Sequence, residues 1–264
     1  MKPAPPTRAT LHPRRSRSAK VMIQNRLGWS DIRKPAELLY HRVTVTRVFV
    51  QARMSSKRFP GKVLAPFRGT TVLGHLLARL QSVVPVESLV VATSDDPSDD
   101  TLVEAMVRAG VLTYRGPLRN VFARFRGCAQ AFPCDWFVRL SADSPLFEPA
   151  LLGEIISRAD ADVDLVTNVQ TRTFPKGHSV ELLRTRTVLA LDERRLTDQD
   201  REHVTTFFYR HPQEFRIINV TSPNPALATL DLCVDQASDL PRLAALSDTA
   251  VPRYGDVRRW PTGC

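Results

Sequence analysis

The chain has 264 residues, 43% of them hydrophobic, which is enough for one sizeable core with an appendage. Its net charge of +10 and isoelectric point near 10.0 would fit a protein that binds nucleic acid or an anionic membrane. However, residues 1–44 hold ten Lys or Arg against two acidic residues, so +8 of the +10 lies there and the body is nearly neutral. This distribution argues against a nucleic-acid-binding body.

The four cysteines form no CxxC pair and have no histidine at metal-ligand spacing, so neither a zinc site nor a disulfide framework is indicated. This composition fits a reducing cytoplasm. The sequence contains no run of 18 apolar residues and no apolar secretory leader, so we expect no membrane span. Three interpretations of residues 1–44 stay open: a disordered basic extension, an organellar transit peptide, or an upstream over-extension of the reading frame.

From residue 45 onward, short β-branched runs alternate with amphipathic stretches. The expected strands cover 45–52, 87–94, 111–116, 136–143 and 162–169, and the expected helices cover 70–84, 99–110, 119–132 and 149–159. Another short strand is expected at 232–235, followed by a final helix that starts near Ser238 and Asp239. We expect a single domain over 45–250 and a short C-terminal tail over 251–264.

This alternation predicts an α/β fold, with a mostly parallel sheet covered by helices on both faces. Ligands of such sheets bind where the carboxyl ends of the strands meet the following loops. The loops at 53–62, 93–96 and 141–145 should therefore share one rim.

The loop after the first strand, in "QARMSSKRFPGKVL" (51–64), is rich in cations and contains no acidic residue. Arg53, Arg58 and Lys62 can converge on phosphate oxygens, since Arg offers a planar donor fork and Lys a compact charge. Ser55 and its neighbour Ser56 add hydroxyl and N–H donors. Because neither GxGxxG nor GxxxxGK[ST] is present, a solvated basic loop remains the alternative.

Two aspartates follow apolar segments that should end at the same rim. Asp143 follows the apolar residues of the strand at 136–143, and Asp235 follows the apolar residues of the short strand expected beside it. Mg²⁺ prefers one or two carboxylates together with substrate phosphates and water, so this pair predicts a magnesium site beside the cationic loop. For either aspartate alone, a helix cap or turn former is the alternative.

Five motifs in this order give the chain a family resemblance. They are "QARMSSKRFPGKVL", "RLSADSPLFEP", "TNVQTRTFPKGHSVELL", "REHVTTFFYRHPQEFRI" and "CVDQASDL". Over about residues 45–247 the chain resembles the cytidylyltransferases that include the 3-deoxy-manno-octulosonate and acylneuraminate enzymes, most nearly their SpsF subgroup. The resemblance implies a GT-A-like, Rossmann-related nucleotidyltransferase fold and commonly a homodimer. It also implies transfer of CMP from CTP to an acidic 2-keto sugar, with Mg²⁺ and release of pyrophosphate, for surface polysaccharide or glycan biosynthesis.

The resemblance also implies roles for individual residues. It places Arg53, Arg58 and Lys62 on the nucleotide phosphates and Asp143 and Asp235 on the metal. The residues that it places near the sugar or the nucleotide, with His203 as a candidate general base, are Arg201, Glu202, His203, Tyr209, Arg210, Lys176, Glu181, Ser94 and Asp95. Ser55, through its donors, and Arg139 are further candidates for substrate binding.

Four positions depart from the family pattern. Ser55 and Lys57 stand where the subgroup has Gly and Thr, which makes the phosphate loop bulkier and more cationic. Ser179 stands in place of an Asp, which removes a carboxylate that the resemblance would place toward the sugar. Asp231 stands in place of an Arg, so the charge beside Asp235 changes by two units.

Two alternatives to a cytidylyltransferase stay open at this point. One keeps the fold but uses another nucleotide or transfers a sugar. The other is a binding protein with a decayed site whose basic residues 1–44 contact nucleic acid or an acidic polymer. The presence of both aspartates and all three phosphate cations argues against the decayed site.

Overall fold

The computed structural model describes residues 44–255, which belong to a compact unit running from Val43 to Cys264. Residues 1–43 and 256–264 lie outside the described residues, and with them nearly all of the predicted N-terminal extension and part of the predicted C-terminal tail.

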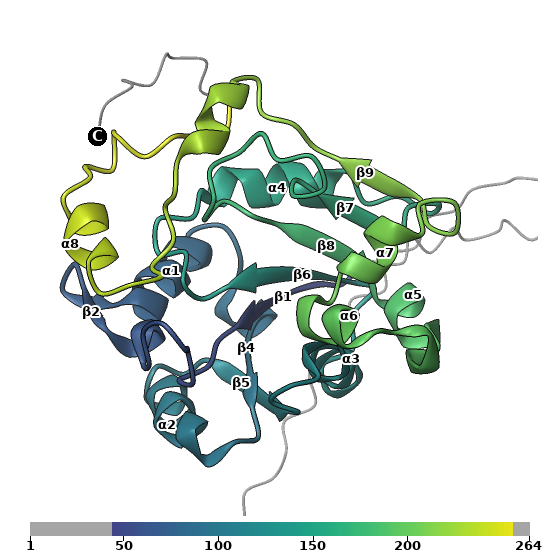
Figure 1. Cartoon of the computed structure of the whole chain (residues 1–264), viewed down its shortest axis with the longest axis horizontal. Helices are drawn as coiled ribbons and strands as arrows, with labels where there is room; N and C mark the ends of the chain where they lie inside the picture. Colours follow the sequence, from purple (N-terminus) through teal and green to yellow (C-terminus); the bar gives the residue numbers. More distant parts are fainter. Residues whose placement is uncertain (1–43, 256–264) are drawn as a thin grey trace, which may run out of the picture. The chain divides into compact units, whose positions relative to one another are not determined.

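A seven-stranded sheet forms the centre of this unit, with the strand order β5-β4-β1-β6-β8-β7-β9 (Figure 1). The strands are β1 (Thr46–Gln51), β4 (Leu89–Ser94), β5 (Leu112–Gly116), β6 (Trp136–Ser141), β7 (Leu165–Thr167), β8 (Glu181–Arg184) and β9 (Ile217–Asn219). Neighbouring strands run parallel except β8, which is antiparallel to both β6 and β7. The structure therefore confirms the predicted mostly parallel α/β sheet.

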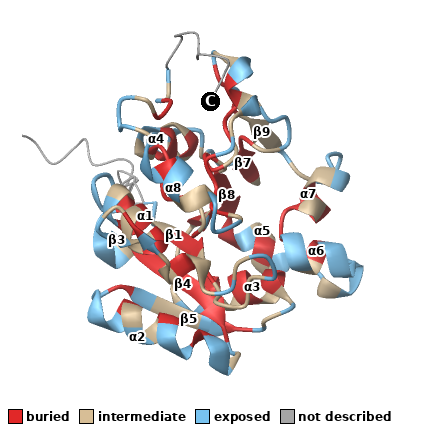
Figure 2. Ribbon diagram, turned by 60° about the vertical axis from the view of Figure 1, so that its left-hand side comes forward, coloured by how far each residue is buried: buried red, intermediate tan, exposed pale blue. Residues whose placement is uncertain are grey.

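Helices cover both faces of the sheet, because successive residues of each strand point to opposite sides. Val48 and Val50 of β1 pack with one group of helices, while Phe49 between them packs with the other. The first group is α1 (Val72–Gln81), α2 (Asp100–Arg108) and α4 (Pro149–Ser157), and the second is α3 (Val121–Ala131), α5 (Thr185–Ala190), α6 (Asp198–His203) and α7 (Thr206–Arg210). Figure 2 shows the buried strands β1, β4 and β8 between these layers.

Local capping explains where the predicted helices begin. The Thr71 side chain accepts a hydrogen bond from Gly74 N at the start of α1, and the Asn120 side chain accepts one from Ala123 N at the start of α3. Pro149 occupies the first turn of α4, where its missing N–H is not needed.

The predicted strand at 232–235 is wrong. The only β-pairing described there is an isolated bridge between Asp231 and Lys176, and the residues that follow run as an irregular segment into α8 (Asp239–Ala244). Within the seven-stranded sheet the chain also forms two strands, β8 and β9, that the sequence pattern did not indicate.

Besides the two hydrophobic clusters on the faces of the main sheet, a third hydrophobic cluster includes the C-terminal part of the described chain. It joins the hairpin β2 (Pro66–Phe67)–β3 (Thr70–Thr71) to α8, and Val251 is 1% exposed within it. Tyr254 also stacks on Phe174, with ring centroids 6.4 Å apart. The described part of the predicted C-terminal tail therefore packs against the domain.

Candidate active site

A cavity of about 330 Å³ opens where the parallel strands β1 and β6 end. Because the two strands pair in register from Thr46–Trp136 to Gln51–Ser141, the loops that follow them emerge side by side. The residues that line the cavity are Gln51, Ala52, Arg53, Ser56, Lys57, Arg58, Lys62, Val63, Ser141, Asp143, Glu202 and Asp235. The cationic loop and both predicted metal-binding aspartates thus meet in one cavity.

The cationic loop is held at its start by a buried carboxylate. Asp99 is 0% exposed and accepts a hydrogen bond from Met54 N at 2.6 Å. Met54 O in turn accepts from Ser56 N and Gly61 N, which folds the loop back on itself. Gly61 has a φ of 74°, a left-handed conformation that favours glycine, and it leads into the 3₁₀ helix η1 (Lys62–Leu64). The Pro-Gly step therefore turns the chain so that Lys62 faces the aspartates.

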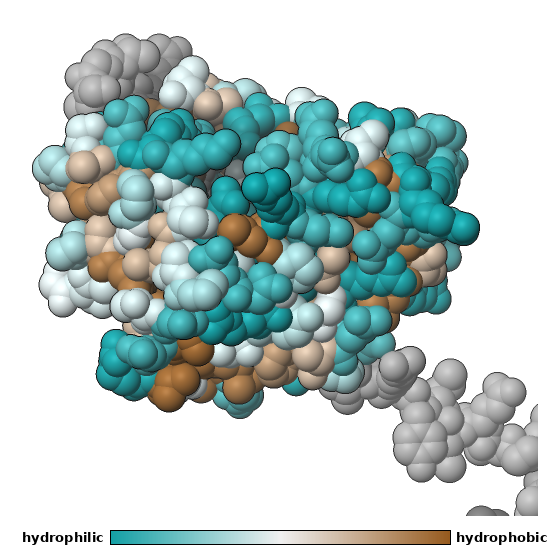
Figure 3. All heavy atoms as spheres, turned by 60° about the horizontal axis from the view of Figure 1, so that its bottom comes forward, coloured by the Kyte–Doolittle hydropathy of each residue, from teal (hydrophilic) through white to brown (hydrophobic). Residues whose placement is uncertain are grey.

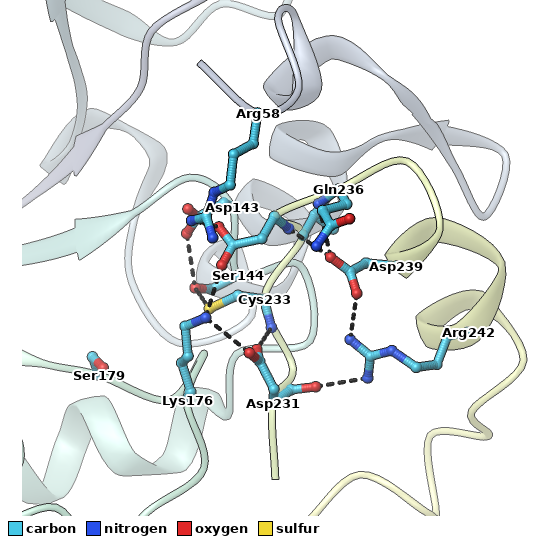
Figure 4. Close-up of polar contacts among 12 residues, drawn as sticks. Arg58, Asp143, Ser144, Lys176, Ser179, Asp231, Cys233, Gln236, Asp239 and Arg242 are labelled. Carbon is cyan, nitrogen blue, oxygen red and sulfur yellow. Dashed lines mark hydrogen bonds and ion pairs between the residues drawn. The ribbon is translucent and has the colours of Figure 1, made fainter. Parts of the chain in front are cut away.

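Lys62 lies between the two aspartates. Its Nζ is 2.7 Å from Asp143 Oδ2, 3.4 Å from Asp235 Oδ1 and 2.8 Å from the carbonyl oxygen of Val234. Arg58 also reaches Asp235, with 2.8 Å between Nη2 and Oδ1 (Figure 4). The Asp143, Asp235 and Lys62 side chains are only 12–21% exposed, so their charges are partly shielded from water.

The cations around Asp235 keep it ionised. Partial burial alone would raise its pKa, but the hydrogen bond and charge of Lys176, together with Lys62 and Arg58, outweigh burial and lower the pKa. A carboxylate that stays ionised at neutral pH suits a metal ligand.

The donor set fits a magnesium ion. Asp143 and Asp235 supply two carboxylates at an open cavity, and Mg²⁺ completes such a site with phosphate oxygens and water. Among residues 44–255 there is no cluster of three His, Cys, Asp or Glu side chains that could hold an ion without such help.

A thiol close to Asp143 does not serve as a nucleophile. The Cys233 side chain is buried, and burial raises its pKa to about 12, so it stays protonated at neutral pH.

The charge change expected at Asp231 is compensated within the structure. Lys176 Nζ lies 2.8 Å from Asp231 Oδ2 and 2.8 Å from Asp235 Oδ2. Burial alone would lower the pKa of Lys176, but its hydrogen bonds to Asp231 and Asp235 raise it. The acid at 231 is therefore paired and does not stand as an uncompensated charge beside Asp235.

The predicted substrate residues Arg139 and Glu181 form an ion pair beside the cavity. Arg139 Nη1 donates to Glu181 Oε2, and its Nη2 donates to Gln51 Oε1 at 3.0 Å, which connects the pair to the cavity lining. Glu181 is 4% exposed, and its Oε1 accepts from Thr205 Oγ1 and Tyr209 OH, each at 2.6 Å. Burial, followed by the charge of Glu181, raises the pKa of Tyr209 and keeps this donor protonated.

Ten predicted site residues do not line the cavity. Four of them are Arg139, Lys176, Glu181 and Tyr209, described above, and the others are Ser55, Ser94, Asp95, Arg201, His203 and Arg210. Ser55 is absent from the lining, whereas its neighbour Ser56 is present. His203 is exposed at the end of α6, whereas its neighbour Glu202 lines the cavity. Asp95 is exposed at the end of β4.

The structure gives Ser94 and Arg210 internal partners. The Ser94 side chain is 0% exposed and its hydroxyl donates to Asp99, so a direct contact of this hydroxyl with the nucleotide does not fit the structure. Arg210 pairs with Asp200, which caps α6 and is also 0% exposed, so Arg210 supports the helix that carries Glu202.

Three contributors were missed from the sequence. Gln51 and Ser141 are the last residues of β1 and β6, so the same strand-end rule that selected the loops would have found them. No sequence pattern points to Asp99. Met54 is distant from it in sequence, and both Met54 and Ser94 donate to it through backbone N–H groups, which any residue type supplies.

No helix among the described residues is both long and apolar enough to cross a membrane.

Comparison with known proteins identifies the family. A family model described as "Cytidylyltransferase" matches residues 47–241. The spore coat polysaccharide biosynthesis protein SpsF of Bacillus subtilis (strain 168) is 30% identical over 213 residues, which are 77% of this chain and 87% of that protein. A 3-deoxy-manno-octulosonate cytidylyltransferase of Anaeromyxobacter sp. (strain Fw109-5) is 31% identical over 122 residues, 46% of this chain and 49% of that protein.

A solved structure agrees with this result. A cytidylyltransferase from Leptospira borgpetersenii serovar Hardjo-bovis (strain JB197) superposes with a TM-score of 0.73 at 27% identity, covering 77% of this chain and 86% of that one. The resemblance predicted from the five motifs is thus confirmed. The chain belongs to the cytidylyltransferase family and is a CTP-dependent nucleotidyltransferase.

Proposed function

We propose that this enzyme transfers CMP from CTP to a 2-keto sugar acid and releases pyrophosphate, as a step in the biosynthesis of a surface polysaccharide or glycan. The observation that carries the proposal is the meeting of four cations of one loop with Asp143 and Asp235 in a single cavity. The cations are Arg53, Lys57, Arg58 and Lys62, and together they suit the charge of a triphosphate.

Two features support an acidic sugar as the acceptor. One relative is named for 3-deoxy-manno-octulosonate, which is a 2-keto sugar acid, and another for spore coat polysaccharide biosynthesis. In addition, the edge of the site carries Lys176, whose side chain is 45% exposed and can receive a carboxylate. Arg139 is joined to the cavity through its hydrogen bond to Gln51.

In the proposed reaction a hydroxyl oxygen of the sugar attacks the α-phosphorus of CTP. The bond from the α-phosphorus to the bridging oxygen breaks, and pyrophosphate leaves with the electron pair. Arg53, Arg58 and Lys62 neutralise the charge that grows on this leaving group. Lys57, which the family pattern did not require, is exposed and lines the same cavity, so we assign it to the phosphates as well.

Asp143 and Asp235 would hold a divalent cation, for which we propose Mg²⁺. When bound, this ion supplies charge stabilisation to the phosphate oxygens and orients the attacking hydroxyl. The proton of that hydroxyl passes to a base at the cavity. We assign this role to Glu202 in preference to His203, because Glu202 lines the cavity and His203 does not.

The substrate class is tested by product analysis. The enzyme is incubated with Mg²⁺, CTP and either a 2-keto sugar acid, such as 3-deoxy-manno-octulosonate or an acylneuraminate, or a neutral sugar of similar size. Pyrophosphate release is measured, and phosphorus NMR identifies the product. We expect a CMP-sugar phosphodiester with an acidic sugar only. Turnover of CTP with the neutral sugars alone would overturn the assignment of the acceptor.

The cytoplasm remains the location that we propose. Three cysteines of the described chain, Cys128, Cys134 and Cys233, are free thiols, which suits a reducing compartment.

A homodimer also remains a proposal. On the face shown in Figure 3 hydrophobic areas alternate with hydrophilic ones, and the large exposed hydrophobic residues include Val83, Val86 and Val107.

A further inference from the structure

Asp231 does not line the cavity, and its side chain forms an ion pair with Lys176 at the edge of the site. The ammonium group of Lys176 lies at the same distance, 2.8 Å, from Asp231 Oδ2 and Asp235 Oδ2 (Figure 4). It is therefore shared between an anion of the proposed metal site and an anion outside it.

The position of Asp231 is fixed by its backbone. The isolated β-bridge joins the two segments through Lys176 N to Leu230 O at 2.9 Å and Leu232 N to Lys176 O at 2.8 Å. Gly177, with a φ of 101°, allows this approach, because a Cβ atom there would lie 2.9 Å from the carbonyl carbon of Leu232.

Further hydrogen bonds aim the Asp231 carboxylate and join its segment to that of Asp235. Asp231 Oδ1 accepts from Cys233 N at 2.9 Å, which leaves Oδ2 for Lys176. Arg242 donates to Asp231 O at 2.7 Å and to Asp239 Oδ1 at 2.9 Å, and Asp239 Oδ2 accepts from Asp235 N at 2.8 Å. The two anions that share Lys176 are thus held in one frame.

Arg58 and Lys62 contact Asp235 Oδ1, so Oδ2 is the oxygen that Lys176 covers. A divalent cation at Oδ2 would lie close to the ammonium group of Lys176, which is 2.8 Å from that oxygen, and the two positive charges would repel each other. Metal binding at Asp235 therefore favours movement of Lys176 toward another anion.

We propose that Asp231 is a positioning residue that receives Lys176 when a divalent cation binds Asp235, and thereby sets the affinity of the metal site. This inference rests on the metal site of the proposed function. Without Asp231, Lys176 has only Asp235 as its anion and competes with the metal. Without Lys176, no ammonium group competes with the metal ion for Asp235 Oδ2, and the site carries one positive charge fewer.

The test is direct titration with Mn²⁺, followed by electron paramagnetic resonance of the free ion in the absence of substrate. We expect Asp231→Asn to weaken Mn²⁺ binding by about 3- to 5-fold and Lys176→Met to strengthen it by about the same factor, as for half-exposed ion pairs. In a Lys176→Met background, Asp231→Asn should have a much smaller effect, because the competitor is already absent.

Asp192→Asn is the matched control. Asp192 is 43% exposed against 47% for Asp231, and it also pairs with a cation, Arg194, but it lies outside the cavity lining. This variant should bind Mn²⁺ like the wild type. Thermal unfolding of each variant checks that the fold is retained.

Two results would overturn the inference while leaving the metal site intact. One is an Asp231→Asn protein that binds Mn²⁺ as tightly as the wild type. The other is an equal loss of affinity in the presence and absence of Lys176, which would indicate a structural role. A wild-type protein that binds no Mn²⁺ would instead overturn the proposed metal site, and this inference with it.

Discussion

Asp99 joins the cationic loop to the end of a neighbouring strand. Its Oδ1 accepts from Met54 N, and its Oδ2 accepts from Thr93 Oγ1 at 2.8 Å and from both the backbone N–H and the hydroxyl of Ser94. Because Thr93, Ser94 and Asp99 are all 0% exposed, the Thr93 and Ser94 donors cannot turn to water if the carboxylate is altered.

We predict that Asp99→Asn lowers the free energy of unfolding by about 1–3 kcal/mol, since an amide nitrogen replaces one accepting oxygen and leaves buried donors unpaired. The KM for CTP should rise as well, because Met54 N no longer anchors the loop. Urea denaturation and steady-state kinetics measure the two effects.

Asp96→Asn serves as the control for this prediction. Asp96 caps the short helix η3 (Pro97–Asp99) through Ser98 N, and an asparagine can accept the same hydrogen bond. If Asp99→Asn leaves both the stability and the KM unchanged, the anchoring role is wrong.

The residues that could be predicted from the sequence are those whose position in the fold follows from a nearby strand. Arg53 and Asp143 follow β1 and β6 by one or two residues, so the strand-end rule places them at the rim. Lys176 and Asp231 are 55 residues apart, and only the fold brings them together. The resemblance indicated both Glu202 and His203, with His203 as the candidate general base, but of the two only Glu202 lines the cavity.

At the scale of elements, the long periodic segments were the most predictable. Helix α1 and strand β4 lie within the predicted ranges 70–84 and 87–94, because hydrophobic periodicity and capping agree there. Strand β7 lies within the predicted range 162–169, whereas β8 and β9, four and three residues long, are too short for a periodic signal and exist through pairing with β6 and β7. The apolar residues at 232–235 resembled a strand because Leu232 and Val234 are buried in a side cluster.

The segment between β7 and β8, which carries Lys176, is fastened by a buried histidine. His178 is 2% exposed, and its Nε2 lies 3.1 Å from the carbonyl oxygen of Leu146. Its own carbonyl accepts from Asn168 Nδ2 at 2.8 Å. Burial, with a further contribution from Arg79, lowers the pKa of His178 to about 4.

This pKa predicts that the stability depends on pH. In the unfolded chain the histidine titrates near its ordinary value of 6.5, so below that pH the unfolded state binds a proton that the folded state excludes. The contribution of His178 is fully present above pH 6.5 and falls by about 3 kcal/mol as the pH approaches 4.

Urea denaturation across this pH range tests the prediction. The His178→Gln variant keeps a side-chain donor for Leu146 O but does not titrate, so its stability should depend less on pH than that of the wild type. Parallel pH profiles for the two proteins would show that His178 does not titrate as described.

At the scale of the whole molecule, the described fold belongs to the unit Val43–Cys264. The cavity and all three hydrophobic clusters consist of residues within this unit. We therefore predict that a chain that begins at Val43 keeps the melting temperature and the rate of pyrophosphate release of the full-length protein. A lost or strongly reduced activity would show that residues 1–42 contribute to the site.

The same truncation examines the nucleic-acid alternative. Most of the net positive charge lies in residues 1–44, so any binding of nucleic acid should weaken with salt and disappear with that segment. Binding that persists in the truncated chain would instead place a nucleic-acid surface on the folded domain.

The central claim is that the cationic loop and the two aspartates form a site for metal-dependent transfer from CTP. The most direct measurement is pyrophosphate release from each of the four nucleoside triphosphates, as a function of Mg²⁺, in the wild type and in Asp143→Ala and Asp235→Ala. Release should occur with CTP and require Mg²⁺, and each variant should lose at least about a hundredfold in rate while remaining folded. Full activity of either variant, or turnover only with UTP or GTP, would contradict the claim.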